Sequence, residues 1–344
     1  MPAAHPPHPE VQRPALLHVR YHRRGATAAD QRHPGGAGRR PRAGRGAGDG
    51  TRGGLAVSTA AVNQKLWEQN ATPKHRIQWC PGCGDFGVLN ALKAALARLE
   101  LMPHDVLLVG GIGCSGQIRN YLNGNAFHGT HGGALAYALG AKMANPDLTV
   151  IALAGDGDTL AIGIENFVHV CRRDPAVTLL IMNNGVYGLT KGQKSPTHGL
   201  GMPQGVSTEE DPPFVDPLRL ALVCGASFVA QTFSGDPKHS ADVLVEALRH
   251  PGFAVINDFS PCVTYNKFNT YDWYKEHVEH LPQDHDASDR QAAWQLLDEF
   301  DGKGKLPLGI VYRHPRQRTA HRRLPLWDEE LAEVDPEPML RLFR

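Results

Sequence analysis

The sequence predicts an α/β fold built on a doubly wound, mostly parallel sheet. Two apolar runs support this prediction, residues 150–154 and 177–182, and a helical pattern of apolar residues lies between them. Crossovers of this kind are short and right-handed, so the two strands should be parallel neighbours. Their carboxyl ends then meet at one edge of the sheet, which is where open parallel sheets bind ligands.

Polar residues follow both runs and suit an anion together with a metal ion. The first run stops at Gly155-Asp156-Gly157-Asp158 and the second at Asn183-Asn184. Glycines let the backbone approach a bulky anion, and carboxylate and amide oxygens suit Mg²⁺, which takes a few protein oxygens together with phosphate oxygens. An ordinary strand-to-helix turn remains the alternative for the first motif alone. The asparagine pair favours a Mg²⁺ and diphosphate site, with Asp156 expected to be an exposed carboxylate.

The rest of the chain alternates helical and strand patterns. We expect helices over residues 85–100, 134–144, 216–224 and 237–250, strands over residues 105–113 and 253–259, and a mobile loop over residues 206–213. Residues 57–300 are expected to form one domain, and residues 301–344 a C-terminal extension that packs on the domain or on a partner. The basic cluster at residues 313–323 is expected to be a solvated face without a role.

The first 56 residues differ in composition from the rest. They contain ten Arg, ten Gly, seven Pro, three acidic residues and no Ser or Lys, so they cannot build a core. A transit peptide would be Ser-rich, and nucleic-acid binding would favour more aromatic residues than Tyr21 alone. We interpret residues 1–56 as a disordered or artefactual extension, with the protein starting near Val57. The remainder holds 26 basic and 32 acidic residues, so the slight positive charge of the whole chain indicates nothing about partners.

The sequence has no secretory signal and no apolar run of membrane length. We therefore expect a cytoplasmic protein that binds neither membrane nor nucleic acid.

Six cysteines divide into two groups. Four lie in loops that contain Gly or Pro, and disulfides do not suit a cytosolic chain of this kind; the four are Cys80, Cys83, Cys114 and Cys262. One close pair plus two distant single residues leaves a 4Fe–4S cluster and a zinc site equally open. Cys171 and Cys224 lie in apolar surroundings and are expected to be small core residues.

The combined motifs resemble a known family. The Gly-Asp-Gly turn followed by the asparagine pair resembles the thiamine diphosphate motif, and residues 186–197 are similar to the beta subunit of 2-oxoacid:ferredoxin oxidoreductases. The resemblance runs from about residue 79 to residue 275 and includes the stretch 266–275. It implies that Asp156, Asn184 and the Val186 carbonyl hold Mg²⁺. It also implies that a 4Fe–4S cluster is held by Cys80, Cys83, Cys114 and Cys262.

The resemblance also implies roles around the cofactor. His131 precedes two glycines that start a helix, where N–H groups can bind an anion, and by resemblance it lies beside the cofactor. Lys191 is implied to bind the substrate carboxylate, which makes Lys191 and His131 the catalytic candidates. Gln117 stands where some relatives carry a basic residue, so the substrate stays open, with Arg119 as a possible substitute. The remaining cofactor-binding candidates are Gly113, Ser115, Gly155, Gly157, Asp158, Gly188 and Leu189.

The implied activity is coenzyme-A-dependent oxidative decarboxylation of a 2-oxoacid, with 2-oxoglutarate favoured over pyruvate. The products are acyl-CoA and CO₂, and electrons pass through the cluster to ferredoxin. Two alternatives remain: a thiamine-dependent non-oxidative decarboxylase or carboligase, and a non-enzymatic module held by a metal. The chain has room for only one sheet domain of this type, so we expect an alpha subunit to supply the pyrimidine-binding domain.

Overall fold

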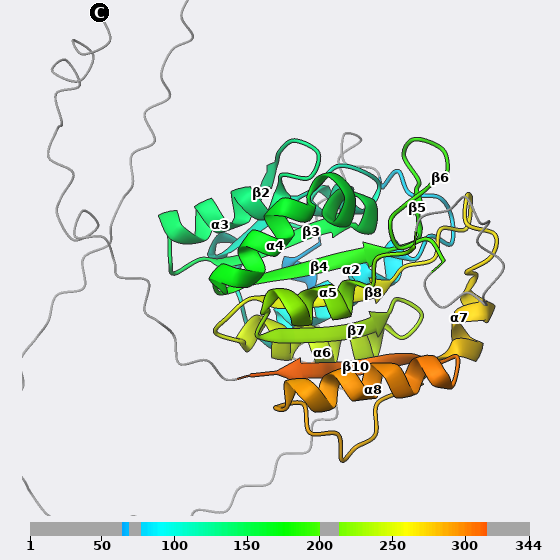
Figure 1. Ribbon diagram of the computed structural model, residues 1–344. Coiled ribbons are helices and arrows are strands. Elements are labelled where there is room, and N and C mark those ends of the chain that lie inside the picture. Colours follow the sequence, from blue (N-terminus) through cyan, green and yellow to red (C-terminus); the bar gives the residue numbers. More distant parts are fainter. Residues whose placement is uncertain (1–63, 69–76, 200–212, 315–344) are drawn as a thin grey trace, which may run out of the picture. The chain divides into compact units, whose positions relative to one another are not determined.

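The computed structural model describes residues 64–68, 77–199 and 213–314 (Figure 1). The chain divides into two units, Met1–Gly54 and Leu55–Arg344, and every described residue belongs to the second. The expected N-terminal extension, most of the expected loop at residues 206–213, and residues 315–344 lie outside the described residues.

A mostly parallel sheet occupies the centre of the second unit (Figure 1). Within the described residues it has eight strands in the order β2-β1-β3-β4-β8-β7-β10-β9, and only β10 against β7 is antiparallel. The expected fold class is confirmed. The strands are β1 (Val106–Gly110), β2 (Asn125–His128), β3 (Thr149–Gly155), β4 (Val177–Asn183), β7 (Phe228–Phe233), β8 (Ala254–Phe259), β9 (Val278–His280) and β10 (Leu306–Arg313).

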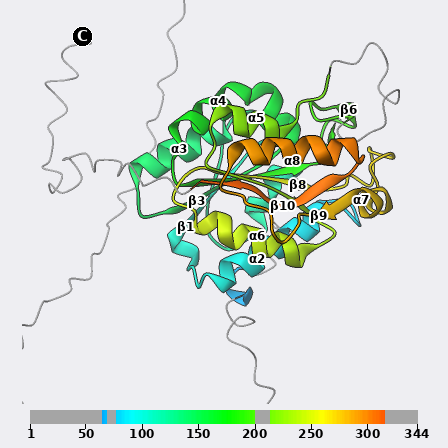
Figure 2. The same cartoon turned by 60° about the horizontal axis from the view of Figure 1, so that its bottom comes forward.

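Helices cover both faces of this sheet (Figure 2). One face carries α2 (Asp85–Arg98) and α6 (Pro237–Arg249), whose apolar residues share a buried cluster with the sheet. The opposite face carries a second buried cluster under four helices, α3 (Ala134–Ala144), α4 (Ile164–Arg173), α5 (Pro217–Cys224) and α8 (Arg290–Gly302). The sheet is therefore buried on both sides, as near-continuous apolar strands require.

The two apolar runs that predicted the fold are β3 and β4. They are parallel neighbours, with Gly155 opposite Met182, so the polar residues after each strand lie at the same edge. Short elements complete this edge: the 3₁₀ helix η3 (Ser115–Asn120), the π-type turn η4 (Asp158–Ile162), the hairpin of β5 (Val186–Tyr187) and β6 (Gln193–Lys194), and α7 (Tyr271–His277). The 3₁₀ helix η2 (Pro103–Asp105) leads into β1 at the opposite edge.

Two expected elements differ from the structure. The strand expected over residues 105–113 ends at Gly110, because the chain turns into η3 soon afterwards and Gly113 takes a left-handed φ of +126°. Strand β10 lies inside the range expected to be a C-terminal extension, yet it joins the main sheet between β7 and β9. The sheet domain thus continues past residue 300, through Arg313.

None of the helices in the described ranges is both long enough and apolar enough to cross a membrane.

Candidate cofactor site

The turn after β3 is fixed by close contact with the β5–β6 hairpin. A Cβ added at Gly157 would collide with the ring of Tyr187, whose hydroxyl donates to the Gly157 carbonyl at 3.3 Å. Only glycine lets the two segments approach this closely. The turn then continues through η4 into α4 and leaves Asp156 at the end of β3.

Asp156 is buried, and the expectation that it is exposed is wrong. Its carboxylate is 1% exposed and accepts hydrogen bonds from the hydroxyls of Ser195 and Thr197, the latter at 2.5 Å. The backbone N–H of Asn184 donates to its other oxygen at 3.4 Å. Burial raises the pKa of Asp156, and the two hydroxyls act against that rise. Sequence reasoning missed Ser195 and Thr197 as site residues, although both lie in the stretch that carries the family resemblance.

Asp158 joins three loops at this edge. One carboxylate oxygen accepts from the N–H of Gly132 at 2.8 Å and from the N–H of Ile112 at 3.2 Å. Nδ1 of His131 lies 2.6 Å from the same oxygen, an ion-pair distance without hydrogen-bond alignment. Asp158 therefore holds the loop after β1 and the start of α3 against the turn after β3.

The asparagine turn after β4 is held from a distant part of the chain. The side-chain oxygen of Asn184 accepts from the N–H of Val186 at 3.0 Å, and its backbone carbonyl accepts from the Asn266 amide at 2.9 Å. Gly185, between Asn184 and Val186, has a left-handed φ of +70°, a conformation that favours glycine. Asn266 opens the stretch 266–275, so that stretch serves to fix the turn.

These segments surround one pocket, which we call the cofactor pocket. It brings together twelve residues that the sequence analysis named and adds three that it missed, Ile112, Tyr187 and Thr190. The twelve are Gly113, Cys114, Ser115, His131, Gly155, Asp156, Gly157, Asp158, Asn184, Val186, Gly188 and Leu189.

Three further candidates do not line the cofactor pocket. Lys191 follows the lining residue Thr190, is exposed, and has a left-handed φ of +78°, which is uncommon for a residue with a side chain. Gln117 accepts from the Asn120 amide at 2.7 Å, and Arg119 donates to the Gly116 carbonyl at 2.6 Å.

Three segments bring the four loop cysteines to the same edge, and we call Cys80, Cys83, Cys114 and Cys262 the cysteine group. The Trp79 indole donates to the Cys114 carbonyl at 2.8 Å, and the Gly84 N–H donates to the Pro261 carbonyl at 3.1 Å. A Cβ at Gly188 would lie 3.5 Å from Sγ of Cys114 and 4.0 Å from Sγ of Cys262. The sulfurs of these two cysteines therefore adjoin the cofactor pocket.

All six cysteines are free thiols. Burial raises the pKa of Cys83, and burial together with the nearby Asp85 carboxylate raises the pKa of Cys114 to about 11. Cys171 on α4 is fully buried in the core, which confirms its expected role. Cys224 is only partly buried and packs against the outside of the same cluster.

The residues of the cofactor pocket fit a magnesium diphosphate. Asp156 and Asn184 line the pocket and offer side-chain oxygens. Thr159, which follows Asp158 outside the lining, has a buried hydroxyl without a hydrogen-bond partner in the described part of the chain. Within the described residues, no three His, Cys, Asp or Glu side chains converge to hold a single metal ion. The expected magnesium set is of another kind, since it combines one carboxylate with an amide oxygen, a backbone carbonyl and phosphate oxygens.

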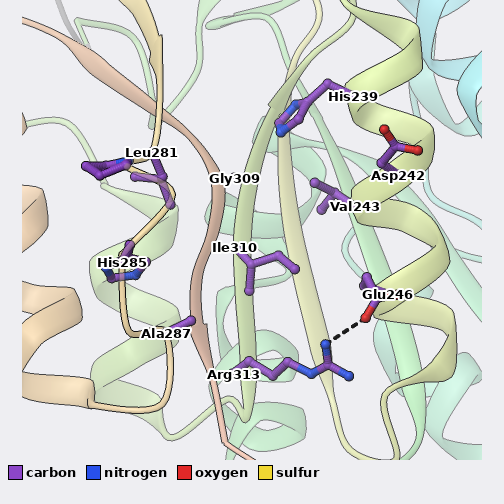
Figure 3. Close-up of a pocket in the computed structure, with 11 residues that line it drawn as sticks. His239, Asp242, Val243, Glu246, Leu281, His285, Ala287, Gly309, Ile310 and Arg313 are labelled. Carbon is purple, nitrogen blue, oxygen red and sulfur yellow. Dashed lines mark hydrogen bonds and ion pairs between the residues drawn. The ribbon is translucent and has the colours of Figure 1, made fainter.

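A second hollow lies away from these residues, between α6, β10 and the segment 281–287 (Figure 3). Its floor includes Val243 and Ile310, and Arg313 pairs with Glu246 at 2.7 Å on its rim. No candidate site residue lines it, so the chemistry is assigned to the cofactor pocket.

Fold and pocket together define a thiamine diphosphate enzyme domain. The family model described as "Thiamine pyrophosphate enzyme, C-terminal TPP binding domain" matches residues 111–257. A second family model, for the C-terminal part of the pyruvate ferredoxin oxidoreductase beta chain, matches residues 262–329.

Similar proteins narrow the class further. The chain is 39% identical over 262 residues to the 2-oxoacid:ferredoxin oxidoreductase subunit beta of Saccharolobus solfataricus, covering 72% of this chain and 85% of that one. It is 41% identical over 272 residues to subunit beta of 2-oxoacid:ferredoxin oxidoreductase 1 of Aeropyrum pernix, covering 75% and 82%. The chain belongs to the beta subunits of 2-oxoacid:ferredoxin oxidoreductases, as the sequence motifs predicted, and is part of an oxidoreductase.

A solved structure agrees with this family. The 2-oxoglutarate:ferredoxin oxidoreductase from Magnetococcus marinus, determined with 2-oxoglutarate, coenzyme A and succinyl-CoA bound, superimposes with a TM-score of 0.71 at 35% identity. The match covers 84% of this chain and 98% of that chain.

Proposed function

We propose that this protein, as a beta subunit, performs coenzyme-A-dependent oxidative decarboxylation of a 2-oxoacid, with electrons leaving through a 4Fe–4S cluster to ferredoxin. The observation that carries the proposal is that the cofactor pocket adjoins two sulfurs of the cysteine group at Gly188. A group bound in the pocket would then lie beside a group bound by the cysteines. Electron transfer between two such groups needs this proximity.

Asp156, Asn184 and the Val186 carbonyl are proposed to hold Mg²⁺, with His131 beside the cofactor. Gly155, Gly157 and Gly188 line the pocket that is proposed to take thiamine diphosphate, and Asp158 keeps the surrounding loops in place. When bound, thiamine diphosphate supplies the electron sink for decarboxylation, and the cluster takes up electrons singly.

The cysteine group is proposed to hold the cluster, since thiolates are its usual ligands. The two hydrogen bonds from Trp79 and Gly84 hold its three segments together. The raised thiol pKa of Cys114 means that binding iron must displace a proton from it.

Substrate binding is proposed to involve Lys191, whose ammonium can pair with the substrate carboxylate at the rim of the cofactor pocket. The left-handed backbone at Lys191 sets the direction of the side chain. We favour 2-oxoglutarate over pyruvate, and coenzyme A as acyl acceptor, because the Magnetococcus marinus relative was determined with those ligands.

An alpha subunit is the proposed partner, and ferredoxin the electron acceptor. Leu189 at the pocket and Ile162 at the end of η4 each expose 58% of their surface, which suits burial against another chain. The pyrimidine end of the cofactor would then lie against that chain, and the beta subunit alone should turn over no 2-oxoacid.

The test is anaerobic purification of the chain with and without a co-expressed alpha subunit. We expect iron, sulfide and thiamine diphosphate in the complex, and dye or ferredoxin reduction that requires coenzyme A and is faster with 2-oxoglutarate than with pyruvate. A colourless, iron-free complex that still decarboxylates would support the non-oxidative alternative instead. Turnover by the beta subunit alone would contradict the need for a partner.

Serine variants test the cysteine group. Cys80→Ser, Cys83→Ser, Cys114→Ser and Cys262→Ser should each lose the visible absorbance of the cluster, because each removes a thiolate ligand. Cys171→Ser and Cys224→Ser are the matched controls and should keep it. A stable cluster in any of the first four would remove that residue from the ligand set.

A further inference from the structure

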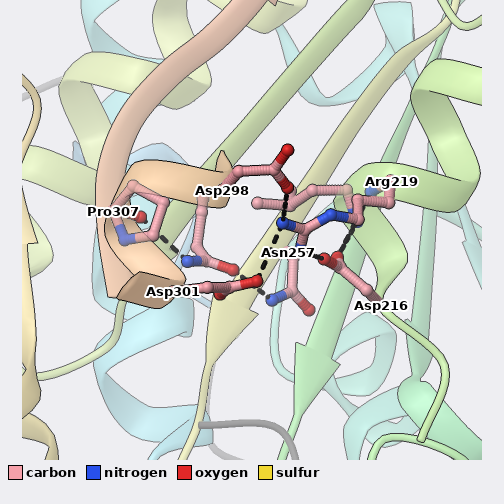
Figure 4. A network of polar contacts seen from close by, with 8 residues as sticks. Asp216, Arg219, Asn257, Asp298, Asp301 and Pro307 are labelled. Carbon is pink, nitrogen blue, oxygen red and sulfur yellow. Dashed lines mark hydrogen bonds and ion pairs between the residues drawn. The ribbon is translucent and has the colours of Figure 1, made fainter. Parts of the chain in front are cut away.

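Three buried amide side chains lie end to end across the sheet. They are Asn183 on β4, Asn257 on β8 and Gln231 on β7, and each is at most 3% exposed. Asn183 donates to Asn257 at 3.0 Å, Asn257 donates to Gln231 at 2.9 Å, and Gln231 donates to the Pro307 carbonyl at 2.8 Å. Figure 4 shows the contacts that run between Pro307 and Asn257. We call the three side chains the amide relay.

The relay has one direction, and its far end sets that direction. A backbone carbonyl can only accept, so Gln231 must turn its NH₂ group toward Pro307 and its oxygen toward Asn257. Asn257 must then turn its NH₂ group toward the Gln231 oxygen, and Asn183 must turn its NH₂ group toward the Asn257 oxygen. The oxygen of Asn183 must therefore face away from the relay, where it accepts from the N–H of Gly185 at 3.3 Å. It also lies 2.7 Å from the Thr197 hydroxyl, whose single hydrogen it shares with the Asp156 carboxylate.

Thr197 connects the relay to the cofactor pocket. Its hydroxyl lies 2.7 Å from the Asn183 oxygen and 2.5 Å from the Asp156 carboxylate. If Asn183 turned over, its NH₂ group would face the N–H of Gly185, and donor would oppose donor. The relay thus fixes Asn183 as an acceptor, and the Thr197 hydroxyl lies between Asn183 and Asp156 with its one hydrogen shared by the two oxygens.

Packing alone does not require amides at these positions. On each strand the residue two positions earlier faces the same way and is a buried apolar residue of one cluster; these are Ile181, Val255 and Val229. Buried amides stabilise a fold only when every donor and acceptor is paired, and apolar residues of the same shape can give the same stability. The polar residues occupy only the layer of the sheet nearest Asp156.

We propose that Gln231 and Asn257 are positioning residues for Asp156, acting through Asn183 and Thr197, and so set the affinity of the site for Mg²⁺. The inference rests on the proposed function, in which Asp156 is a magnesium ligand. Neither residue touches the cofactor pocket. Both act by holding the hydroxyl that contacts the ligand carboxylate, as outer partners of metal ligands commonly do.

The experiment is a Mg²⁺ titration of the chain purified with its partner subunit, after chelation, at fixed thiamine diphosphate, with retained thiamine diphosphate as the readout. Gln231→Met keeps the length of the side chain but removes the donor to Pro307, and should weaken Mg²⁺ binding about 10-fold. Thr178→Val is the matched control, since it removes a buried hydroxyl of β4 that donates to the Ala247 carbonyl, and it should leave Mg²⁺ affinity unchanged. If Gln231→Met fails to fold, Gln231→Glu replaces it, because it keeps the shape and, when ionised, cannot donate to Pro307.

A double variant separates positioning from general loss of stability. Thr197→Val removes the link, so adding Gln231→Met to it should weaken Mg²⁺ binding no further. Two results would overturn the relay and leave the proposed site intact. One is full additivity of the two losses of Mg²⁺ affinity in the double variant. The other is wild-type Mg²⁺ affinity in Gln231→Met while Asp156→Asn loses the cofactor. Retention of cofactor by Asp156→Asn would overturn the magnesium assignment itself, and the inference with it.

Discussion

Asp156 is the carboxylate proposed to bind Mg²⁺, and three neighbouring groups hold it in place. It lies at the end of β3, almost fully buried, and two hydroxyls and one N–H point at it. Burial disfavours its charged form, which is the direction of its pKa shift. A bound divalent cation would reverse that penalty, because the charge would then be paired.

Asp156→Asn should lose Mg²⁺-dependent thiamine diphosphate binding while the chain remains folded. The amide keeps an acceptor for Ser195 and Thr197 but supplies no negative charge, so we expect cofactor affinity to fall by about 100-fold or more. The free energy of unfolding at pH 7 should not fall, because the variant removes a carboxylate whose charged form is disfavoured by burial. Calorimetric titration and urea unfolding measure the two effects, with the exposed Asp284→Asn as control. Unchanged cofactor affinity would contradict the ligand assignment.

Asp258 is a second buried carboxylate, at the end of β8. Thr232 donates to one of its oxygens at 2.6 Å and Ser240 donates to the same oxygen at 3.0 Å, while the other oxygen has no partner. Burial raises its pKa from 3.8 to about 7. Between these two values the folded chain binds more protons than the unfolded chain, so the free energy of unfolding falls as pH rises.

Asp258→Asn should remove part of this pH dependence. Wild-type stability should decline by as much as a few kcal/mol between about pH 4 and pH 7 from this residue, and then level off. Asp85, whose pKa is raised to about 6, adds a decline of the same sign and remains in both proteins. Urea unfolding at pH 5, 6, 7 and 8 compares the slopes. Equal slopes would mean that Asp258 does not titrate in this range.

At the scale of elements, the turn after β3 and the β5–β6 hairpin depend on each other. Gly157 and the Tyr187 ring are in contact, and the Tyr187 hydroxyl bonds back to the turn. The hairpin also leads to Ser195 and Thr197, which contact Asp156. A displacement of the hairpin would therefore reach the carboxylate.

Gly157→Ala should displace the hairpin and weaken cofactor binding, because the added methyl group meets the Tyr187 ring. Gly140→Ala is the matched control: it lies within α3 with open space around its Cβ, so it should stabilise the chain by about 0.5–1 kcal/mol and leave cofactor affinity unchanged. Thiamine diphosphate binding and thermal unfolding of both variants are the measurements. Equal cofactor affinity in the two would show that the hairpin can shift without effect.

Elements could be predicted where the local pattern was strong. The runs of β3 and β4 are continuous and apolar, and the polar residues after them identified the pocket. Strand β10 contains Pro307 and Gly309, which weaken its strand pattern in the sequence. Its pairing with β7 is also irregular after Ile310. Local patterns carry no information on pairing across the fold. The burial of Asp156 by residues some forty positions away could not be predicted for this reason, nor could the amide relay.

At the scale of the whole molecule, both family models match residues beyond the N-terminal extension. The two family models match residues 111–257 and 262–329, and the described fold begins at residue 64. Deletion of residues 1–56 should leave assembly and activity unchanged, because that composition offers no apolar face to bury. Gel filtration with the alpha subunit and the rate of ferredoxin reduction are the checks. Loss of the complex on deletion would show that the extension takes part in assembly.

The order of the strands has a consequence for how the protein is made. Strand β8 lies between β4 and β7, although it follows both in the chain, and Cys262 comes directly after it. On the ribosome, Cys80, Cys83 and Cys114 emerge long before the strand that brings the fourth sulfur to them. A nascent chain that ends before β8 has a divided sheet and lacks one of the four cysteines proposed to hold the cluster. If the cysteine group holds the proposed cluster, iron delivery must wait until synthesis has passed residue 262, and a chain stalled earlier would present free thiols to the cell's oxidants.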